Sequence, residues 1–309
     1  MFTGVIAETE RKLKGNIDWI NKYKEYADAI NSQIIPIKNA RKVIKQWYPF
    51  KLYLPINCAM KEPVTFSLRY MGKHIAEIQV GQQGALLRIK GGSYKKGAWD
   101  EWGGVIGRTF RKTYKGNADR VKRNEHFIET HILSEMQRGD RNKFNGKLTY
   151  IQPVVLGNAP FQMLLPINGN TGTPIYVGNN PGQGHIDILA RYKRMLTVIE
   201  LKKPRSSEAI EKCIKQALIY TTGIACLLRS ESGKTWWNNF GYTRPLPDNL
   251  EVNAIVMVDP GEIKLQRLKK LVNEQRIYLL ADKKVKIHLG YIHYHMDSNG
   301  KMDLKEIVI

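Results

Sequence analysis

The sequence predicts a mixed α/β protein in which a helix and a β-rich segment precede helices packed on a mixed sheet. Apolar residues recur at helical spacing over residues 5–30. Between residues 34 and 90, short β-rich runs such as "VTFSLRY" and "KHIAEIQV" are separated by glycine-containing turns, as in an antiparallel meander. From residue 119 onward, helical and strand-like runs alternate. We therefore expect an N-terminal accessory module at residues 1–115 and a second domain at residues 116–309.

Residues 91–107, near the end of the accessory module, are rich in glycine and predict a loop or linker. The second domain begins with residues 119–138, which predict a helix that Gly139 ends. Residues 148–180 predict a strand and a Gly/Asn/Pro-rich loop. The remaining expected elements are the strands "HIDILA" and "LTVIELKKP", a helix over 207–222, the strand "ACLLR", an irregular insertion "SGKTWWNNFGYTRPLPDN", the strand "LEVNAIVMV", the helix "GEIKLQRLKKLVNEQR" and a terminal hairpin turned at 297–300.

The charge of the chain indicates a polyanionic partner. Lys and Arg number 49 against 28 Asp and Glu, which leaves a net charge of +21 at a sequence pI near 9.8. Such an excess repels itself unless a polyanion is bound, and nucleic acid is the commonest one. An acidic membrane surface is the alternative, but no helix combines a basic face with bulky apolar anchors.

Hydropathy and cysteine spacing argue against a membrane protein, a secreted protein and a disulfide-bonded protein. No apolar run approaches the length of a membrane span, and the N-terminus has no apolar region typical of a signal peptide. The three cysteines, Cys58, Cys213 and Cys226, lack metal-binding spacing, and an odd number suits free thiols in a reducing interior. We therefore expect a cytoplasmic protein with no membrane partner.

Glu-x-Lys occurs three times in the chain, and only one copy lies in a buried setting. Glu10 belongs to a charged helix, and Glu262 begins a helix, where an acid favours the positive helix terminus. Glu200 instead lies in "LTVIELKKP", which has the Val/Ile/Leu density of a central strand. The Glu-x-Lys segment at Glu200 is therefore the candidate for a catalytic site.

The strand period places chemically active groups on one face of this strand. Alternation puts Glu200 and Lys202 on the same face, and antiparallel pairing with "HIDILA" brings Asp187 to the same end of the sheet. Two carboxylates form an oxygen-rich site for Mg²⁺, and a lysine beside a scissile phosphate can position or activate a nucleophile. The alternative interpretation is a buried ion-pair network, which is costly without another benefit.

Asp187, a spacing of twelve residues and Glu200-Leu201-Lys202 together resemble the PD-(D/E)XK nuclease superfamily. Ile186 stands where the family motif has proline. The resemblance covers about residues 122–226 and implies a restriction-endonuclease-like αβββαβ core with Mg²⁺ as cofactor, for which Mn²⁺ can substitute. It also implies that Asp187 and Glu200 bind the metal and that Lys202 is catalytic.

Two further features lie where the family has functional residues. Gln216 and Tyr220 are one turn apart on a predicted helix and resemble the Gln-x-x-x-Tyr element of RecB-like nucleases, which implies catalytic roles. Upstream, Glu125 and Glu129 are also one turn apart. The resemblance implies that a glutamate on this helix completes the metal site, and we expect Glu125, with Glu129 in reserve.

A basic run interleaved with Phe110 and Tyr114 leads into that helix and has the composition of a nucleic-acid track. Trp236 and Trp237, in the insertion, suit either base stacking or a protein contact. The residues expected to bind nucleic acid are Arg108, Arg111, Lys112, Lys115, Arg120, Lys122, Arg123 and Lys203.

The expected function is that of a metal-dependent deoxyribonuclease, similar to stand-alone prokaryotic defence or repair nucleases, which often form homo-oligomers. One alternative is an RNA-processing nuclease, which the basic charge permits equally. Another is a DNA-binding or scaffold protein with an inactive nuclease core, although a decayed site tends to lose an acid or the lysine.

Overall fold

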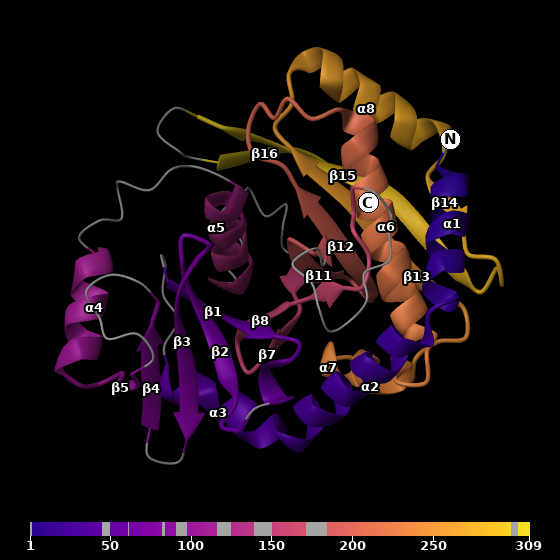
Figure 1. Cartoon of the computed structure of the whole chain (residues 1–309). Helices are drawn as coiled ribbons and strands as arrows, with labels where there is room; N and C mark the ends of the chain where they lie inside the picture. The colour runs from indigo at the N-terminus through magenta and orange to yellow at the C-terminus, as the bar shows by residue number, and fades with distance from the viewer. Residues whose placement is uncertain are drawn as a thin grey trace.

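The structure, a computed structural model, describes residues 2–44, 50–60, 62–81, 84–90, 98–115, 125–138, 150–170, 184–297 and 302–309. The helices are α1 (Thr3–Lys14), α2 (Ile17–Ser32), α3 (Ile34–Val43), η1 (Cys58–Met60), α4 (Val105–Lys115), α5 (Glu125–Arg138), α6 (Ile210–Leu228), α7 (Gly233–Asn239) and α8 (Glu262–Glu274). The strands are β1 (Phe50–Pro55), β2 (Thr65–Tyr70), β3 (Lys73–Gly81), β4 (Gly84–Ile89), β5 (Asp100–Glu101), β6 (Ile151–Pro153), β7 (Val155–Leu156), β8 (Ala159–Gln162), β9 (Leu164–Leu165), β10 (Gly184–His185), β11 (Ile188–Tyr192), β12 (Met195–Leu201), β13 (Leu250–Val258), β14 (Ile277–Leu279), β15 (Val285–Met296) and β16 (Met302–Val308). The protein is thus mixed α/β, as the sequence predicts (Figure 1).

The N-terminal segment forms three helices. The single helix expected over residues 5–30 is instead α1 and α2, because Gly15 ends the first and Asn16 caps the second by accepting from the Asp18 N–H at 3.0 Å. The β-rich run expected from residue 34 begins with α3, where Pro36 lies in the first turn, a position that tolerates proline. Ile37 and Ala40 fix this helix by burying one face.

The N-terminal sheet has the strand order β5-β4-β3-β2-β1-β8-β7. Strands β1 to β4 pair antiparallel, as the expected meander requires. The glycine-rich stretch expected to be a loop also contains β5 and the beginning of α4. Because β1 pairs in parallel with β8, the sheet joins residues 50–55 to residues 159–162. The sheet therefore contains strands from both sides of the expected boundary at residue 115.

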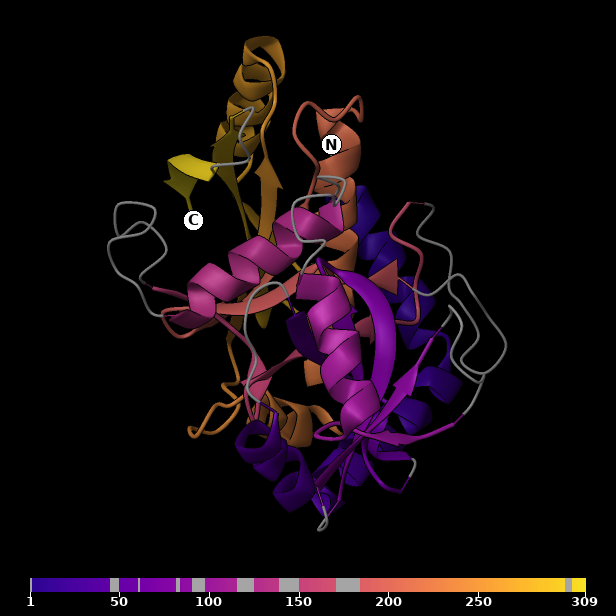
Figure 2. The same ribbon diagram turned by 90° about the vertical axis from the view of Figure 1, so that its left-hand side faces the viewer.

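The C-terminal sheet has the order β14-β15-β13-β12-β11-β6, with β16 paired to β15. The expected hairpin of β11 and β12 is confirmed, and so is the terminal hairpin of β15 and β16. Helix α6 packs on one face and α5 on the other, with the two faces of β12 contributing to separate hydrophobic clusters. Figure 2, seen from the left-hand side of Figure 1, shows α4 beside the strands of the N-terminal sheet.

The strand expected at "ACLLR" is instead the end of α6, whose described residues are almost all buried. An apolar run this short does not distinguish a buried strand from a buried helix turn, and here the helix simply continues. Likewise, the expected insertion contains α7, a short helix that packs against α2 and α6.

Both tryptophans of α7 are buried. Trp236 is 0% exposed, its Nε1 donates to the Tyr23 carbonyl at 3.1 Å, and its ring lies against those of Phe161 and Phe240. Trp237 is 5% exposed and stacks on Tyr242 at a centroid distance of 3.7 Å. These rings are core contacts within the protein, so they are not available to stack on bases.

Trp236→Ala should therefore reduce the free energy of unfolding by about 3–5 kcal/mol, because it empties a fully buried site and removes a hydrogen bond. Ile263, which is 86% exposed on α8, supplies the control. Ile263→Ala should change stability by less than about 0.5 kcal/mol. Chemical denaturation followed by tryptophan fluorescence and circular dichroism measures both, and equal small effects would contradict the core placement.

Candidate active site

The candidate site begins with the register of β11 and β12. Ile188 lies opposite Ile199 and Leu189 opposite Val198, so continuing the ladder by one residue places Asp187 opposite Glu200. Asp187 precedes the first residue of β11, and its Oδ2 accepts from the Leu201 N–H at 2.8 Å. The pairing expected from the sequence thus brings the two carboxylates to the same end and the same face of the sheet.

Lys202 lies on that face and connects two acids. Its Nζ is 2.8 Å from Glu200 Oε1 and 3.0 Å from Glu208 Oε2. The lysine backbone is held as well, because its N–H donates to the Met257 carbonyl at 3.0 Å and its carbonyl accepts from the Tyr294 hydroxyl at 2.5 Å. The ammonium position is therefore fixed both at its backbone and at its charged end.

Burial and like charge govern the ionisation of the pair. Burial raises the pKa of Asp187 well above its ordinary value, and the carboxylates of Glu200 and Glu129 act in the same direction. Burial also raises the pKa of Glu200 to about 7, against the opposing charge of Lys202. Although burial disfavours its charged form, Glu200 and Glu208 raise the pKa of Lys202. The ammonium is therefore kept charged beside carboxylates that repel each other.

One oxygen of the pair lacks a partner. Glu200 is 4% exposed, and its Oε2 has no hydrogen-bond partner among the described residues. A buried carboxylate oxygen without a donor is costly, so this atom is suited to a cation. Within the same part of the chain, no three His, Cys, Asp or Glu side chains form a ready group of metal ligands. Any metal here would rest on few protein oxygens.

Helix α5 brings two more acids to this end of the sheet. Glu125 Oε1 accepts from the Lys203 N–H at 3.2 Å, just beyond the end of β12. Glu129 is buried and accepts from the Tyr53 hydroxyl at 2.8 Å, with His126 Nδ1 at 3.5 Å from its other oxygen. Glu125 raises the pKa of Glu200, whereas Glu129 raises that of Asp187. Both glutamates singled out by the sequence therefore flank the carboxylate pair.

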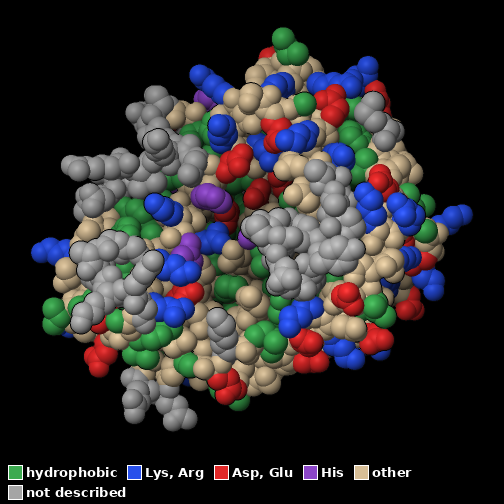
Figure 3. All heavy atoms as spheres, in the orientation of Figure 1, with side chains coloured by type: hydrophobic (Ala, Val, Ile, Leu, Met, Phe, Trp, Pro, Cys, Tyr) green, Lys and Arg blue, Asp and Glu red, His purple; other side chains and the backbone are tan. Residues whose placement is uncertain are grey.

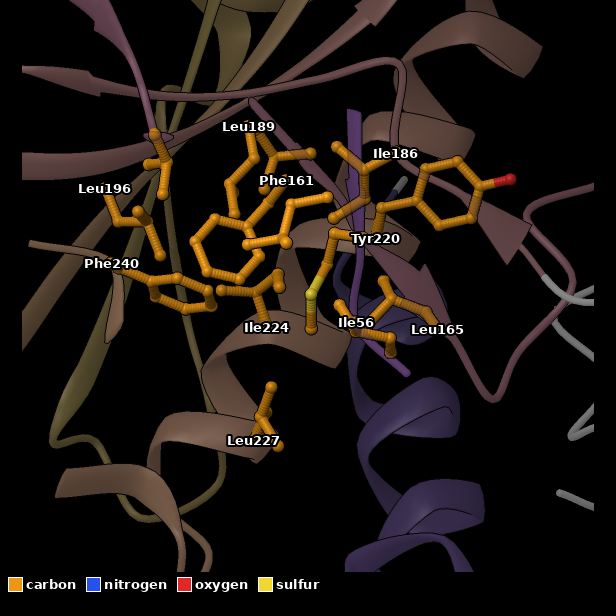
Figure 4. Close-up of a cluster of buried hydrophobic side chains, with 14 of the residues drawn as sticks. Ile56, Phe161, Leu165, Ile186, Leu189, Leu196, Tyr220, Ile224, Leu227 and Phe240 are labelled. Atoms are coloured by element: carbon orange, nitrogen blue, oxygen red, sulfur yellow. The ribbon is translucent and has the colours of Figure 1, made fainter. Parts of the chain in front are cut away.

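Gln216 and Tyr220 lie one turn apart on α6, and the structure shows an electrostatic link to the carboxylate pair only for Tyr220. Gln216 donates to Asn170 Oδ1 at 2.9 Å, while its own Oε1 is buried with no partner among the described residues. Burial raises the pKa of Tyr220, and the charges of Glu200 and Asp187 act in the same direction. Figure 4 shows the Tyr220 ring at the edge of a hydrophobic cluster with its hydroxyl pointing away from the other labelled side chains.

The basic residues expected to bind nucleic acid differ in their exposure and contacts, and some lie outside the described residues. Arg108 and Arg111 lie on α4 and donate to the backbone carbonyls of Gly103 and Trp102, while Lys112 is exposed. Phe110 is buried and Tyr114 packs on Phe50 and Tyr70, so these aromatics belong to the core. Lys203 is exposed next to Glu125. Arg120, Lys122, Arg123 and the side chain of Lys115 lie outside the described residues.

The structure adds residues that sequence reasoning missed. Glu208 precedes α6 and holds Lys202 together with Glu200. Tyr53 on β1 holds Glu129, and Arg69 on β2 lies over the Tyr53 ring. Of these residues, only Glu208 could have been found from the sequence nearby, because it is an acid between Lys202 and the next helix.

In Figure 3, acidic, histidine and basic side chains gather near the middle of the face seen in Figure 1.

Comparisons with family models, curated proteins and solved structures gave no match to this chain.

The packing of Tyr220 against Gly169 supports a stability test that is independent of any activity. A Cβ at residue 169 would overlap the Tyr220 side chain, whose atoms are the nearest ones to it. Gly169→Ala should therefore cost about 1–3 kcal/mol by overpacking. In a Tyr220→Ala background the same change should cost much less, giving a coupling of about 1 kcal/mol or more.

Gly4→Ala is the matched control for this cycle, because a Cβ there meets nothing within 4 Å. It should leave stability unchanged or slightly raised, since alanine favours a helix. Thermal and urea denaturation of the four cycle members and the control measure the coupling. Strictly additive effects would show that Tyr220 does not lie against residue 169.

Proposed function

We propose that this chain is a metal-dependent nuclease that hydrolyses phosphodiester bonds of DNA. The observation that carries the proposal is that Asp187, bonded to the Leu201 N–H, lies at the same end of the sheet as Glu200 and the fixed Lys202. Two acids and a lysine at one sheet end are the groups that phosphodiester hydrolysis needs: metal ligands, and a cation that positions the nucleophile or the phosphate.

The succession of elements supports a restriction-endonuclease-like core. Helix α5 is followed by β6, β11 and β12, which are antiparallel neighbours, and then by α6 and β13. Strand β13 pairs in parallel with β12. This is the αβββαβ order that the resemblance implies, with β7 to β10 inserted after its first strand and α7 inserted before its last.

The donors at the site fit Mg²⁺. The ion prefers carboxylate oxygens and retains several waters, so it needs only one or two protein carboxylates. Glu200 Oε2 is buried with no partner among the described residues, and Asp187 lies across from it. Asp187 and Glu200 would hold Mg²⁺ or Mn²⁺, with Glu125 or Glu129 on the α5 side. The ion would supply charge stabilisation at the phosphate and a more acidic water.

The other residues have roles that follow from their positions. Lys202 presents an ammonium that Glu200 and Glu208 keep charged, so it can hold a phosphate oxygen or orient the attacking water. Gln216 and Tyr220 stand on the α6 side, where an amide and a hydroxyl can contact the strand or a bound water. A purely structural ion pair is the competing explanation, but it does not account for the unpartnered Glu200 oxygen.

The net charge of +21 supports a nucleic acid as partner. The proposal takes DNA as the substrate, in prokaryotic defence or repair, and a cytoplasmic homo-oligomer as the working form. In the described residues no helix is both long and apolar enough to cross a membrane. The competing explanations are an enzyme that cuts RNA and a DNA-binding scaffold with an inactive core, and a cleavage experiment distinguishes them.

The central experiment incubates plasmid, linear duplex, single-stranded DNA and RNA with the chain in Mg²⁺, Mn²⁺ or EDTA. DNA should be cut with either metal and remain intact in EDTA. Asp187→Asn and Lys202→Met should slow cleavage by about 10³-fold or more, because each removes charge stabilisation worth several kcal/mol. DNA binding by both variants should stay within a few-fold of the unaltered chain, because the positive surface supplies most of the affinity.

Glu262 provides the control for these variants, because it is exposed and belongs to another Glu-x-Lys segment. Glu262→Gln changes the same kind of charge outside the site and should cleave normally. Cleavage at the normal rate by both Asp187→Asn and Lys202→Met would remove these residues from the chemistry. Cleavage of RNA alone would replace DNA as the substrate, and tight DNA binding without cleavage under any metal would favour a scaffold.

A second experiment tests whether the exposed basic side chains of α4 bind DNA. If Arg108 and Lys112 each neutralise a phosphate, changing both to Gln should reduce the slope of log K against log salt by about 2. Arg41→Gln with Lys42→Gln, on the exposed side of α3, removes the same charges elsewhere and should leave the slope unchanged. Fluorescence anisotropy with a labelled duplex at several salt concentrations measures both, and equal slopes would exclude α4 from the DNA-binding surface.

A further inference from the structure

The N-terminal sheet brings an arginine to the candidate active site. Arg69 on β2 places its guanidinium 4.4 Å from the centroid of the Tyr53 ring, a distance typical of a cation–π contact. The hydroxyl of the same tyrosine donates to Glu129 at 2.8 Å. Arg69 therefore rests on a ring that is itself bonded to an acid whose charge acts on Asp187.

The backbone fixes Arg69 in this position. The register of β2 and β3 shifts between Leu68 and Arg69, an irregularity of the kind that redirects a side chain. The turn that follows has positive φ at Met71 and Gly72, and a Cβ at residue 72 would overlap the backbone of His126. The β2–β3 turn thus packs directly on the first turn of α5, the helix that carries Glu125 and Glu129.

The surroundings of Arg69 leave its charge available. It is half-buried, it has no ion pair with a described residue, and its Nε is buried with no hydrogen-bond partner among those residues. Glu129 is already bonded to Tyr53. No acid among the described residues therefore neutralises its charge.

We propose that Arg69 binds a backbone phosphate of the nucleic acid beside the carboxylate pair, so that the N-terminal sheet completes the substrate-binding site. This inference rests on the proposed function for the identity of the ligand. An arginine stacked on an aromatic ring can still donate from its Nη groups at the edge of the guanidinium plane, and that edge matches phosphate oxygens. A positive charge is needed near the carboxylates because they repel the phosphate backbone of the substrate, and Arg69 offsets part of that repulsion.

The test measures binding rather than cleavage, with the full chain and a labelled DNA duplex in EDTA. Arg69→Met keeps much of the side-chain length and removes the charge. It should weaken binding about tenfold and reduce the salt slope by about 1, the effect of losing one phosphate contact. Arg69→Lys keeps the charge and should retain the salt slope.

Arg88 is the matched control, because it lies 4.8 Å over the Trp99 ring on the same sheet but is paired with Glu77. Arg88→Met should leave the affinity and the salt slope unchanged. Thermal denaturation of every variant separates a binding effect from unfolding, and Arg69→Gln replaces Arg69→Met if the latter does not fold.

The outcomes distinguish this inference from the proposed function. Equal affinity and salt slope for Arg69 and Arg88 variants would overturn the inference even if the unaltered chain cuts DNA in Mg²⁺. Weakened binding by the Arg69 variants, with no cleavage by the unaltered chain in any metal, would uphold the phosphate contact and overturn the nuclease. Absence of any binding by the unaltered chain would overturn both.

Discussion

Two carboxylates forced together at the end of a buried hairpin are the constraint on which the site depends. The pairing of β11 and β12 brings Asp187 to the end of β12 that carries Glu200, and burial raises the pKa of both. The charge of Glu200 further raises the pKa of Asp187, and the charges of Glu125 and Glu208 further raise that of Glu200. The protein compensates in part with the Leu201 N–H and the Lys202 ammonium. It leaves Glu200 Oε2 without a partner among the described residues. An apolar pair would be cheaper to bury here, so the retained charges favour a functional explanation over a purely structural one.

The groups around the pair act mainly by holding other groups in place. Lys202 is fixed by Glu208 at its ammonium and by Tyr294 at its carbonyl, so its charge has little freedom to leave the face. Tyr220 is confined by the close approach of Gly169 and Gly184 to its ring. Such positioning matters because a catalytic group is effective only within a narrow range of geometry, and fixing it in advance lowers the cost of reaching the transition state.

The parts of the site that local pattern determines could be predicted, and the parts set by distant packing could not. Alternation along "LTVIELKKP" was enough to place Glu200 and Lys202 on one face, and the short basic turn predicted the pairing with Asp187. The end of α6 was misjudged, because its apolar residues fit a buried strand equally well. Tyr53 and Arg69 gave no signal at all. Their roles depend on a contact with α5, which follows them by more than fifty residues and is unrelated to the period of their own strands.

The contact between Tyr53 and α5 is one of several that join residues 1–115 to the rest of the chain. Strand β1 pairs with β8, α1 packs along α6, and Tyr53 donates to the buried Glu129. Without residues 1–115, the outer side of α6 would lose its cover and Glu129 would lose its donor, leaving a buried acid unsatisfied beside Asp187. The first part of the chain therefore contributes to the stability of the carboxylate site itself.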